Sequence, residues 1–395
     1  MPSLSCTHAI KRANMNIKIN RERLATSFTE LCEISSPSRK EAEVLTYLKE
    51  KFTELGAESI YEDNSATKTG SNCGNLIIRF SGSLAEKEEL FFSCHMDTVE
   101  PADNVEVVRT GDIFTSKGDT ILGGDDKSGI AAIIEMITCL QENKTPHASF
   151  DVILTTCEEI GLLGAKHLET DKIQAKYGYA LDSTGINNVI IGAPTANKIE
   201  ITVKGLAAHA GLAPESGINA ITLAAKALSK IRVGRLDDES TSNFGIISGG
   251  VASNIVADLV TIQGEVRSHS PEKAQKYTQE ITDVFSAEVA NWVKQEATGE
   301  ALPSVECVIT DDYPALSLDI GSPVIKRIKE ASAKCGKELN YIVAGGGSDA
   351  NILNGHGFPT AIVASGMEKV HTLDEELDLN NLVEATELVF SLVTE

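Results

Sequence analysis

Acidic and imidazole side chains follow several apolar runs of this sequence, and they are of the kinds that bind metal ions or move protons. These residues are His95, Asp97, Asp125, Asp126, Glu158, Glu159, Asp182 and His371. In open α/β sheets, ligands bind at the edge formed by the carboxyl ends of the strands. If the apolar runs are neighbouring parallel strands, these side chains meet at that edge.

A cluster of carboxylates needs positive charge among its members, because like charges repel strongly in a poorly solvated site. Carboxylate and imidazole ligands without thiolate suit zinc, manganese or cobalt. Three coordinating carboxylates and a hydroxide ion carry four negative charges, which two divalent cations would offset and one would not. The residue types therefore predict two divalent ions, zinc first, with manganese or cobalt as alternatives.

The pair His95 and Asp97 has a spacing that suits a metal-bound histidine. Residues i and i+2 of a strand point to the same face, so the Asp97 carboxylate can hydrogen-bond the imidazole. A metal-bound histidine usually has such a carboxylate behind it. A half-buried histidine–aspartate pair in a loop would give the same pattern, so the spacing alone leaves both interpretations open.

Asp125 and Asp126 lie in the segment GDTILGGDD, just before an apolar helical stretch. Aspartate is a good N-cap, and negative charge is favourable at a helix N-terminus. One aspartate is enough for that role, so the second is free to serve a site. The glycines at 123 and 124 allow backbone conformations that other residues avoid.

The adjacent residues Glu158 and Glu159 follow the run DVILTTC. On a regular strand their side chains would point to opposite faces. If both serve one site, the strand has to end at Cys157, and the glycines at 161 and 164 fit an end there.

Helices and strands alternate in the first half of the chain, which predicts an α/β domain with a mostly parallel sheet. Apolar residues at helical spacing cover 21–38, 40–57 and 128–142, and short apolar runs predict strands over 75–80, 89–95, 151–157, 179–183 and 189–192. The same alternation resumes after residue 313.

The pattern changes near residue 197, where strand and helix signals follow the order β-α-β-β-α-β. That order is the split βαβ arrangement of a small α+β, ferredoxin-like sandwich. We therefore expect residues 15–196 and 313–395 to form one domain, interrupted by an inserted domain over 197–312.

Composition limits the classes of function. The 395 residues include 57 acidic and 35 basic side chains, for a formal charge of −22, and such a surface repels nucleic acid and anionic membranes. No apolar run reaches the ~18–20 residues that span a bilayer. Eight cysteines without a C-x-x-C pair favour reduced thiols and a cytoplasmic location. The first residues lack the apolar stretch of a signal peptide, and either Met1 or Met15 fits as the start.

Six segments occur in an order that is typical of one family: HMDTV, GGDDKSG, CEEIGLLGA, ALDSTG, KGLAAHAGLAPESGINAI and VHTLDEEL. On these segments, the sequence from about residue 20 to its end resembles the dinuclear-metal aminoacylase/carboxypeptidase family, and most of all its peptidase T (tripeptide aminopeptidase) branch. The resemblance implies a metallopeptidase domain with an inserted lid and dimerisation domain, through which a homodimer would form.

The resemblance also implies a ligand set for two ions. His95 and Asp182 would bind one ion, and Glu159 and His371 would bind the other. Asp125 would bridge the two ions, and the peptide bond that follows it would be cis.

Two further acidic residues would take part in the reaction by the same resemblance. Asp97 would orient His95. Glu158 would be the general base, which takes a proton from the attacking water and passes it to the leaving amine.

The resemblance places substrate contacts in the inserted domain and in the segment after it. His209, in GLAAHAG, would donate a hydrogen bond to the developing oxyanion, either from a partner subunit or after domain closure. Asn254 and Arg267 would hold the carboxylate end of the substrate, and Gly346 and Gly347 would line its pocket. Without the resemblance, His209 is a surface histidine near a turn and Arg267 an exposed strand arginine.

These features favour a metal-dependent exopeptidase that acts on short peptides and releases the N-terminal residue of tripeptides. An N-acyl-amino-acid deacylase or a carboxypeptidase of the same family would use the same residues. A non-catalytic relative that binds metal or peptide is the third hypothesis. Glu158 argues against it, because a binding module needs no general base.

Overall fold

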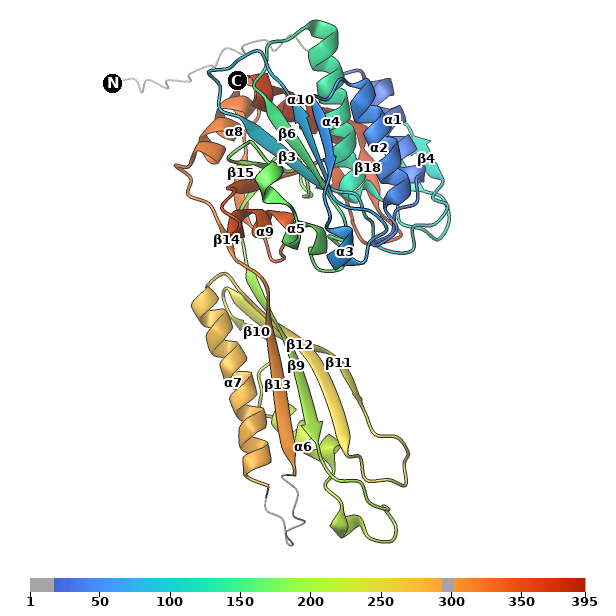
Figure 1. Cartoon of the computed structure of the whole chain (residues 1–395), viewed down its shortest axis with the longest axis vertical. Coiled ribbons are helices and arrows are strands. Elements are labelled where there is room, and N and C mark those ends of the chain that lie inside the picture. The colour runs from blue at the N-terminus through green and yellow to red at the C-terminus, as the bar shows by residue number, and fades with distance from the viewer. Residues whose placement is uncertain (1–17, 293–301, 395) are drawn as a thin grey trace, which may run out of the picture. The chain divides into compact units, whose positions relative to one another are not determined.

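The computed structural model describes residues 18–292 and 302–394, and these form two compact units (Figure 1). The first unit takes the described residues up to Ile191, Ser317–Val343 and the residues from Ser348 onward. The second takes Gly192–Leu316 and Ala344–Gly347. The expected start of the first domain at Met15 lies outside the described residues.

The first unit contains a mixed sheet with nine described strands, in the order β1-β2-β6-β3-β7-β16-β8-β14, with β15 paired to β8. The bounds are β1 Ser59–Glu62, β2 Leu76–Phe80, β3 Leu90–His95, β6 Phe150–Thr155, β7 Gly178–Ala180, β8 Asn188–Ala193, β14 Leu316–Ser317, β15 Asn340–Val343 and β16 Thr360–Val363. The neighbours β6, β3, β7 and β16 run parallel, whereas β2 and β8 pair with them antiparallel. The α/β class is confirmed, with the parallel arrangement confined to the centre of the sheet.

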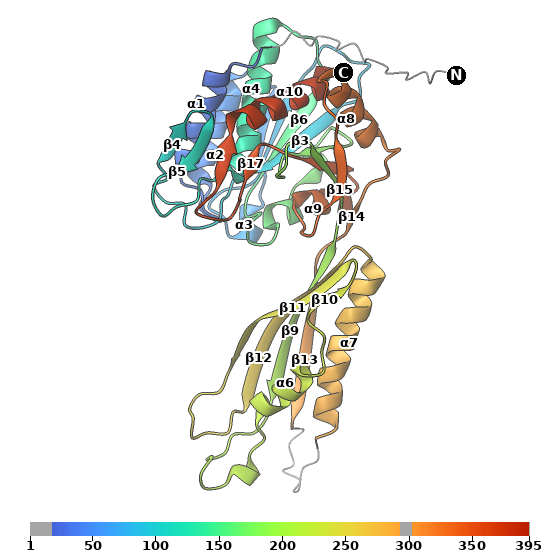
Figure 2. The same cartoon turned by 180° about the vertical axis from the view of Figure 1, so that it is seen from behind.

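Helices cover both faces of this sheet (Figures 1 and 2). Their bounds are α1 Arg21–Glu33, α2 Ala42–Glu54, α3 Ala66–Thr69, α4 Gly124–Asn143, α5 Leu163–Lys166, α8 Pro323–Lys334, α9 Asp349–Gly355 and α10 Leu379–Thr394. Ile78 and Phe92 belong to a core shared with α1, α2, α4, α8 and α10. The alternate residues Ile77 and Phe91 belong to a smaller core that includes Leu353 of α9. Burial on both faces explains why the strands are uninterrupted apolar runs.

A separate small sheet joins residues 107–116 to residues 367–378, near the C-terminus. Its order is β17-β18-β5-β4, with the bounds β4 Val107–Thr110, β5 Ile113–Ser116, β17 Met367–Glu368 and β18 Glu376–Asp378. These strands are too short to show a periodic pattern, so the sequence does not predict them. The loop between β17 and β18 carries His371, and this sheet therefore determines where that histidine lies.

The second unit is an antiparallel sheet in the order β10-β11-β12-β9-β13, with α6 and α7 packed on one face. The bounds are β9 Thr195–Lys204, α6 Ala220–Leu228, β10 Gly234–Asp237, β11 Ser240–Gly249, β12 Leu259–Ser268, α7 Pro271–Ala290 and β13 Ser304–Tyr313. Every second residue of β9 (Ile199, Ile201 and Val203) is buried in the core with the two helices. The predicted split βαβ order is confirmed, and β10 is an additional short edge strand.

Among the described helices of both units, none combines the length and the apolar character needed to cross a membrane.

Candidate metal centre

The acidic and imidazole residues predicted from the sequence gather where β3, β6 and β7 end. β3 ends at His95, which is in register with Thr155, the last residue of the parallel strand β6. Asp182 follows the end of β7 by two residues, and Asp125 is the second residue of α4. Because parallel neighbours end at the same edge, the segments that follow them lie close together.

Two groups of candidate ligand atoms form at this edge, and they share Asp125. The first group is His95, Asp125 and Asp182, and the second is Asp125, Glu159 and His371; within each group the ligand atoms lie within 4.8 Å of one another. Oδ1 of Asp125 is 3.0 Å from Nε2 of His95, and its Oδ2 is 3.2 Å from Nε2 of His371. The same Nε2 atom of His371 lies 3.0 Å from Oε1 of Glu159. Asp125 thus turns one oxygen to each group, as a carboxylate that bridges two cations would.

The ring of His95 is held so that Nε2 faces Asp125. Nδ1 of this buried ring lies 2.8 Å from the main-chain carbonyl oxygen of Asp97. A carbonyl oxygen can only accept, so Nδ1 carries the proton and Nε2 is the ligand atom. The i, i+2 spacing predicts that the Asp97 carboxylate contacts this ring, and its Oδ1 lies at an ion-pair distance of 3.6 Å from Nδ1, farther than the carbonyl oxygen. Asp97 lies beyond the end of β3, where the alternation of strand faces no longer applies.

The cluster is strongly acidic and mostly buried, with the exposed His371 at its edge. Burial raises the pKa of Glu158 and of Asp182 well above their ordinary values, and neighbouring carboxylates raise both further. Hydrogen bonds to Asp125 and Glu159 raise the pKa of His371 to about 10. These shifts all favour positive charge between the carboxylates. Each group offers one imidazole nitrogen and two carboxylates, a donor set that fits divalent zinc, manganese or cobalt.

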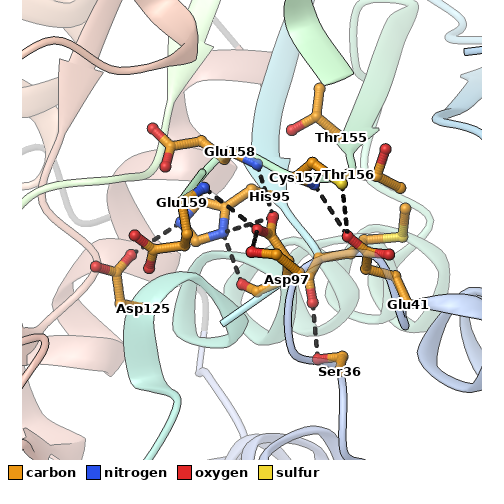
Figure 3. Close-up of polar contacts among 12 residues, drawn as sticks. Ser36, Glu41, His95, Asp97, Asp125, Thr155, Thr156, Cys157, Glu158 and Glu159 are labelled. Atoms are coloured by element: carbon orange, nitrogen blue, oxygen red, sulfur yellow. Dashed lines mark hydrogen bonds and ion pairs between the residues drawn. The ribbon is translucent and has the colours of Figure 1, made fainter. Parts of the chain in front are cut away.

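The loop that follows β6 is held by side chains from distant parts of the first unit. β6 ends at Thr155, two residues before the end predicted from the sequence. The Thr156 amide donates to Oδ1 of Asn75 at 3.0 Å. The Cys157 amide donates to Oε1 of Glu41 at 3.0 Å (Figure 3). Cys157 has a φ of +55°, so the chain turns sharply here.

Asp97 holds the next two amides of this loop. Its Oδ1 accepts from the Glu158 amide at 2.9 Å, and its Oδ2 accepts from the Glu159 amide at 3.2 Å (Figure 3). The hydroxyl of Ser38 donates to Oδ2 at 2.6 Å. The Asp97 carboxylate therefore positions the two glutamates, while its carbonyl oxygen orients the histidine.

The two glutamates lie in different surroundings. Glu159 belongs to the second ligand group, beside Asp125 and His371, whereas Glu158 belongs to neither group. Figure 3 shows the Glu159 carboxylate next to that of Asp125 and the Glu158 carboxylate apart from both. Glu158 is nonetheless buried, at 9% exposure, and the charge of Asp182 acts on it. Because the Glu158 carboxylate lies beside both groups but belongs to neither, it is free to exchange a proton.

The aspartate pair lies at a kink near the start of α4, where both residues have non-helical backbone angles. The N-cap residue of α4 is Gly123, and no side chain caps it. The peptide bond between Asp125 and Asp126 is cis, as the resemblance implies. Asp126 is fully buried, and burial raises the pKa of its carboxyl group well above the ordinary value. Asp125, rather than Asp126, is the member of the pair in the ligand groups.

Four buried acceptors at this site are not predicted from the sequence: Glu41, Asn75, Asp349 and Glu375. Three of them, Glu41, Asn75 and Asp349, lie at or just before the start of a helix or strand. Polar residues are common at such positions, so the sequence does not indicate that these three support the site. Asp349 accepts a hydrogen bond from the Thr155 hydroxyl, and burial raises its pKa to about 6. Of these four, Glu375 alone could have been suspected from the sequence, because it follows the predicted ligand His371 by four residues in VHTLDEEL.

In the second unit, His209 and Asn254 lie together. An isolated strand-like bridge joins His209 to Ile255, and the Ala210 amide donates to the carbonyl oxygen of Asn254 at 2.9 Å. Both residues lie in exposed loops. Asn254 precedes β12 by five residues, so the two residues are found near the start of that strand.

Arg267 and the two glycines form a separate group at the other end of β12. A Cβ atom on Gly346 would lie 3.8 Å from Nη1 of Arg267, and Gly347 is the next residue. The guanidinium is half-buried and donates from Nη2 to Glu265 at 3.1 Å. The four residues predicted to hold substrate are therefore not brought together within this unit, since Asn254 stands at the opposite end of the strand.

Comparisons with known proteins agree on one family. Residues 91–395 match the profile of peptidase family M20/M25/M40. The chain is 40% identical to the protein YqjE of Bacillus subtilis (strain 168), over 95% of its own length and 99% of that protein. Among solved structures, it is similar to aminopeptidase PepT from Bacillus cereus ATCC 10987, with a TM-score of 0.86 and 38% identity over 95% of this chain and 98% of that one. It is also similar to a tripeptidase from Staphylococcus aureus subsp. aureus Mu50, with a TM-score of 0.87 and 35% identity over 95% and 98% of the two chains.

Proposed function

Because the chain belongs to peptidase family M20/M25/M40 and is a peptidase, we propose that it is a metal-dependent aminopeptidase that removes the N-terminal residue of short peptides, tripeptides above all. The observation that carries the proposal is the sharing of Asp125 by two ligand groups, with the uncommitted carboxylate of Glu158 beside them. The similarity to an aminopeptidase at 38% identity and to a tripeptidase at 35% identity supports the choice of substrate.

The proposal includes two divalent ions. One would be held by His95, Asp125 and Asp182, and the other by Asp125, Glu159 and His371. Zinc is our first choice because imidazole and carboxylate suit it, with manganese or cobalt as alternatives. When bound, two ions in such a site polarise a peptide carbonyl group and lower the pKa of water.

The Glu158 carboxylate is the proposed general base. It takes a proton from the water whose oxygen forms a bond to the carbonyl carbon, and it delivers that proton to the amine nitrogen as the C–N bond breaks. Glu159 cannot share this task, because its carboxylate faces His371 at 3.0 Å within the second ligand group. Asp97 supports the division of tasks by holding the amides of both glutamates.

The proposed role of His209 is to donate a hydrogen bond to the oxyanion that develops on the carbonyl oxygen. Its Nδ1 accepts from the amides of Gly211 and Leu212, at 3.1 and 3.2 Å. An Nδ1 atom that accepts carries no proton, so the proton of the neutral ring is on Nε2. The exposed side chain can therefore offer that proton to a substrate.

The separation of His209 from Arg267 supports a homodimer. β12 spans about 26 Å between these ends, at about 3.3 Å per residue, and an extended tripeptide spans about 10 Å. One peptide cannot reach both ends of one unit. We therefore propose that Arg267 of one subunit binds the carboxylate end of the substrate, while His209 and Asn254 reach that substrate from the other subunit. The exposed Ile246 and Ile247, at 59% and 60%, lie on the part of β11 that β10 does not cover. An uncovered apolar strand edge of this kind is suited to an interface.

We also place the protein in the cytoplasm, because eight cysteines without a C-x-x-C pair do not form the pattern of a disulfide framework. The formal charge of −22 disfavours nucleic acid and anionic membranes as partners.

Metal removal followed by product analysis tests this function. After treatment with a chelator and dialysis, the protein should hydrolyse no peptide, and zinc should restore the activity. The restored enzyme should release the N-terminal residue of a tripeptide, and acetylation of the amino terminus should block cleavage. Release of the C-terminal residue would instead identify a carboxypeptidase, and removal of the acetyl group a deacylase. Absence of hydrolysis with both ions bound would favour a non-catalytic binding protein.

A further inference from the structure

Glu375 is a buried carboxylate that neither ligand group uses. It is 1% exposed, and both of its oxygens accept hydrogen bonds from main-chain amides before and at the start of α4. Oε2 accepts from Leu122 and Gly123 at 2.9 and 2.8 Å, and Oε1 accepts from Asp125 at 3.1 Å. Three amide donors on one carboxylate make a strong and directional contact.

The loop before α4 is shaped to receive this carboxylate. Gly123 has a φ of +77°, in the left-handed region that favours glycine. A Cβ atom on Gly124 would lie 3.1 Å from Oε1 of Glu375, so a larger residue would press on the carboxylate. Asp125 and Asp126 have non-helical backbone angles, so the regular part of α4 begins after them, and Glu375 satisfies amides of the turn that leads into the helix.

The same residue lies four positions after His371, in the loop between β17 and β18. Short strands anchor the two ends of this loop through the buried Met367 and Leu377, while Lys369 and His371 between them are exposed. The ion pair between Lys369 and Glu376 is largely solvent-exposed, and such pairs contribute little to stability. Glu375 is thus a buried polar tie between the loop of His371 and the loop of Asp125.

We propose that Glu375 is a positioning residue that sets the distance between Asp125 and His371 and thereby builds the second metal site. The inference rests on the proposed two-metal function. The first group shares Asp125 with the second, but its other two members do not depend on Glu375, because His95 ends β3 and Asp182 lies two residues after β7, at the centre of the main sheet. The second group depends on a short hairpin, and Glu375 fixes that hairpin to the loop of the shared ligand.

The test is a calorimetric titration of the chelated and dialysed full-length chain with zinc. Wild type should bind two ions. Glu375→Ala should bind the second ion with about 10–100-fold lower affinity, the usual cost of losing a partner that supports a metal ligand. The first ion, which shares only Asp125 with the second, should be weakened clearly less. Glu376→Ala is the matched control, because it makes the same change at the next residue, whose carboxylate faces Lys369. It should bind both ions as wild type does.

A double variant separates positioning from a general loss of stability. His371→Ala alone should weaken the second ion, and adding Glu375→Ala should weaken it little further, since both changes disable the same site. A merely structural role would make the two effects add and would weaken both ions equally. If a thermal unfolding scan shows that Glu375→Ala does not fold, Glu375→Gln takes its place. That variant keeps the side-chain size and one acceptor oxygen, and it should show the same selective loss.

Wild-type affinity for both ions in the Glu375 variant that folds, or equal weakening of both, would overturn the inference and leave the two-metal proposal standing. Fewer than two ions on the wild-type chain would overturn the two-metal proposal itself. The two failures are therefore distinguishable in one set of titrations.

Discussion

Replacing Glu158 with alanine is expected to lower kcat by about 10²–10⁴-fold, the usual contribution of a general acid–base group, and to leave both metal ions bound. The reason is geometric, because Glu158 is buried beside the two ligand groups and belongs to neither. Its removal takes away the proton acceptor without removing a ligand. The measurement is kcat on a tripeptide together with the metal content of the same dialysed sample.

Added metal provides the control for this variant. Because no ligand is lost, excess zinc should not restore turnover by Glu158→Ala. Glu158→Gln, which keeps the side-chain volume but cannot take up the proton, should behave in the same way. Turnover within a few-fold of wild type in both variants would exclude Glu158 as the base and leave Asp349, the buried carboxyl group beside it, as the candidate.

Replacing the neighbouring Glu159 with alanine is expected to act through metal binding instead. The change removes one of the three residues of the second group, beside Asp125 and His371. Loss of a partner behind a ligand already costs 10–100-fold in metal affinity, so loss of the ligand itself should cost at least about 10²-fold. Titration with zinc should show one tightly bound ion rather than two, and excess zinc should restore part of the turnover.

The comparison of the two variants is informative because the substitutions are chemically identical and adjacent. Retention of both ions by Glu159→Ala would show that the second group is not a metal site. Loss of an ion from Glu158→Ala would make Glu158 a ligand. Either result would end the division of roles between the two glutamates.

The α/β class and the gathering of the candidate ligands at one edge of the sheet could be predicted from the sequence for a physical reason. Strands at the centre of the main sheet are buried on both faces, so their sequences are uninterrupted runs of apolar residues. Polar residues just after such runs have to lie at the edge of the sheet. This applies to His95, Glu159 and Asp182, at or just after the ends of β3, β6 and β7. Their imidazole and carboxylate groups indicate metal binding.

The residues that support the ligands could not be predicted in this way. Glu41 bonds the Cys157 amide across 116 residues of sequence, and Asn75 bonds the Thr156 amide across 81. No local pattern shows which distant amide a buried side chain will bond, because that depends on packing between elements. The spacing of His95 and Asp97 brings the two residues into contact, but the main-chain carbonyl of Asp97 makes the shorter contact because β3 has already ended at His95.

The most direct test of the two-metal centre is a crystal structure of the zinc-loaded protein, with anomalous scattering measured on both sides of the zinc absorption edge. Two zinc peaks are expected, one among His95, Asp125 and Asp182 and the other among Asp125, Glu159 and His371. A single peak, or peaks outside these two groups, would contradict the assignment.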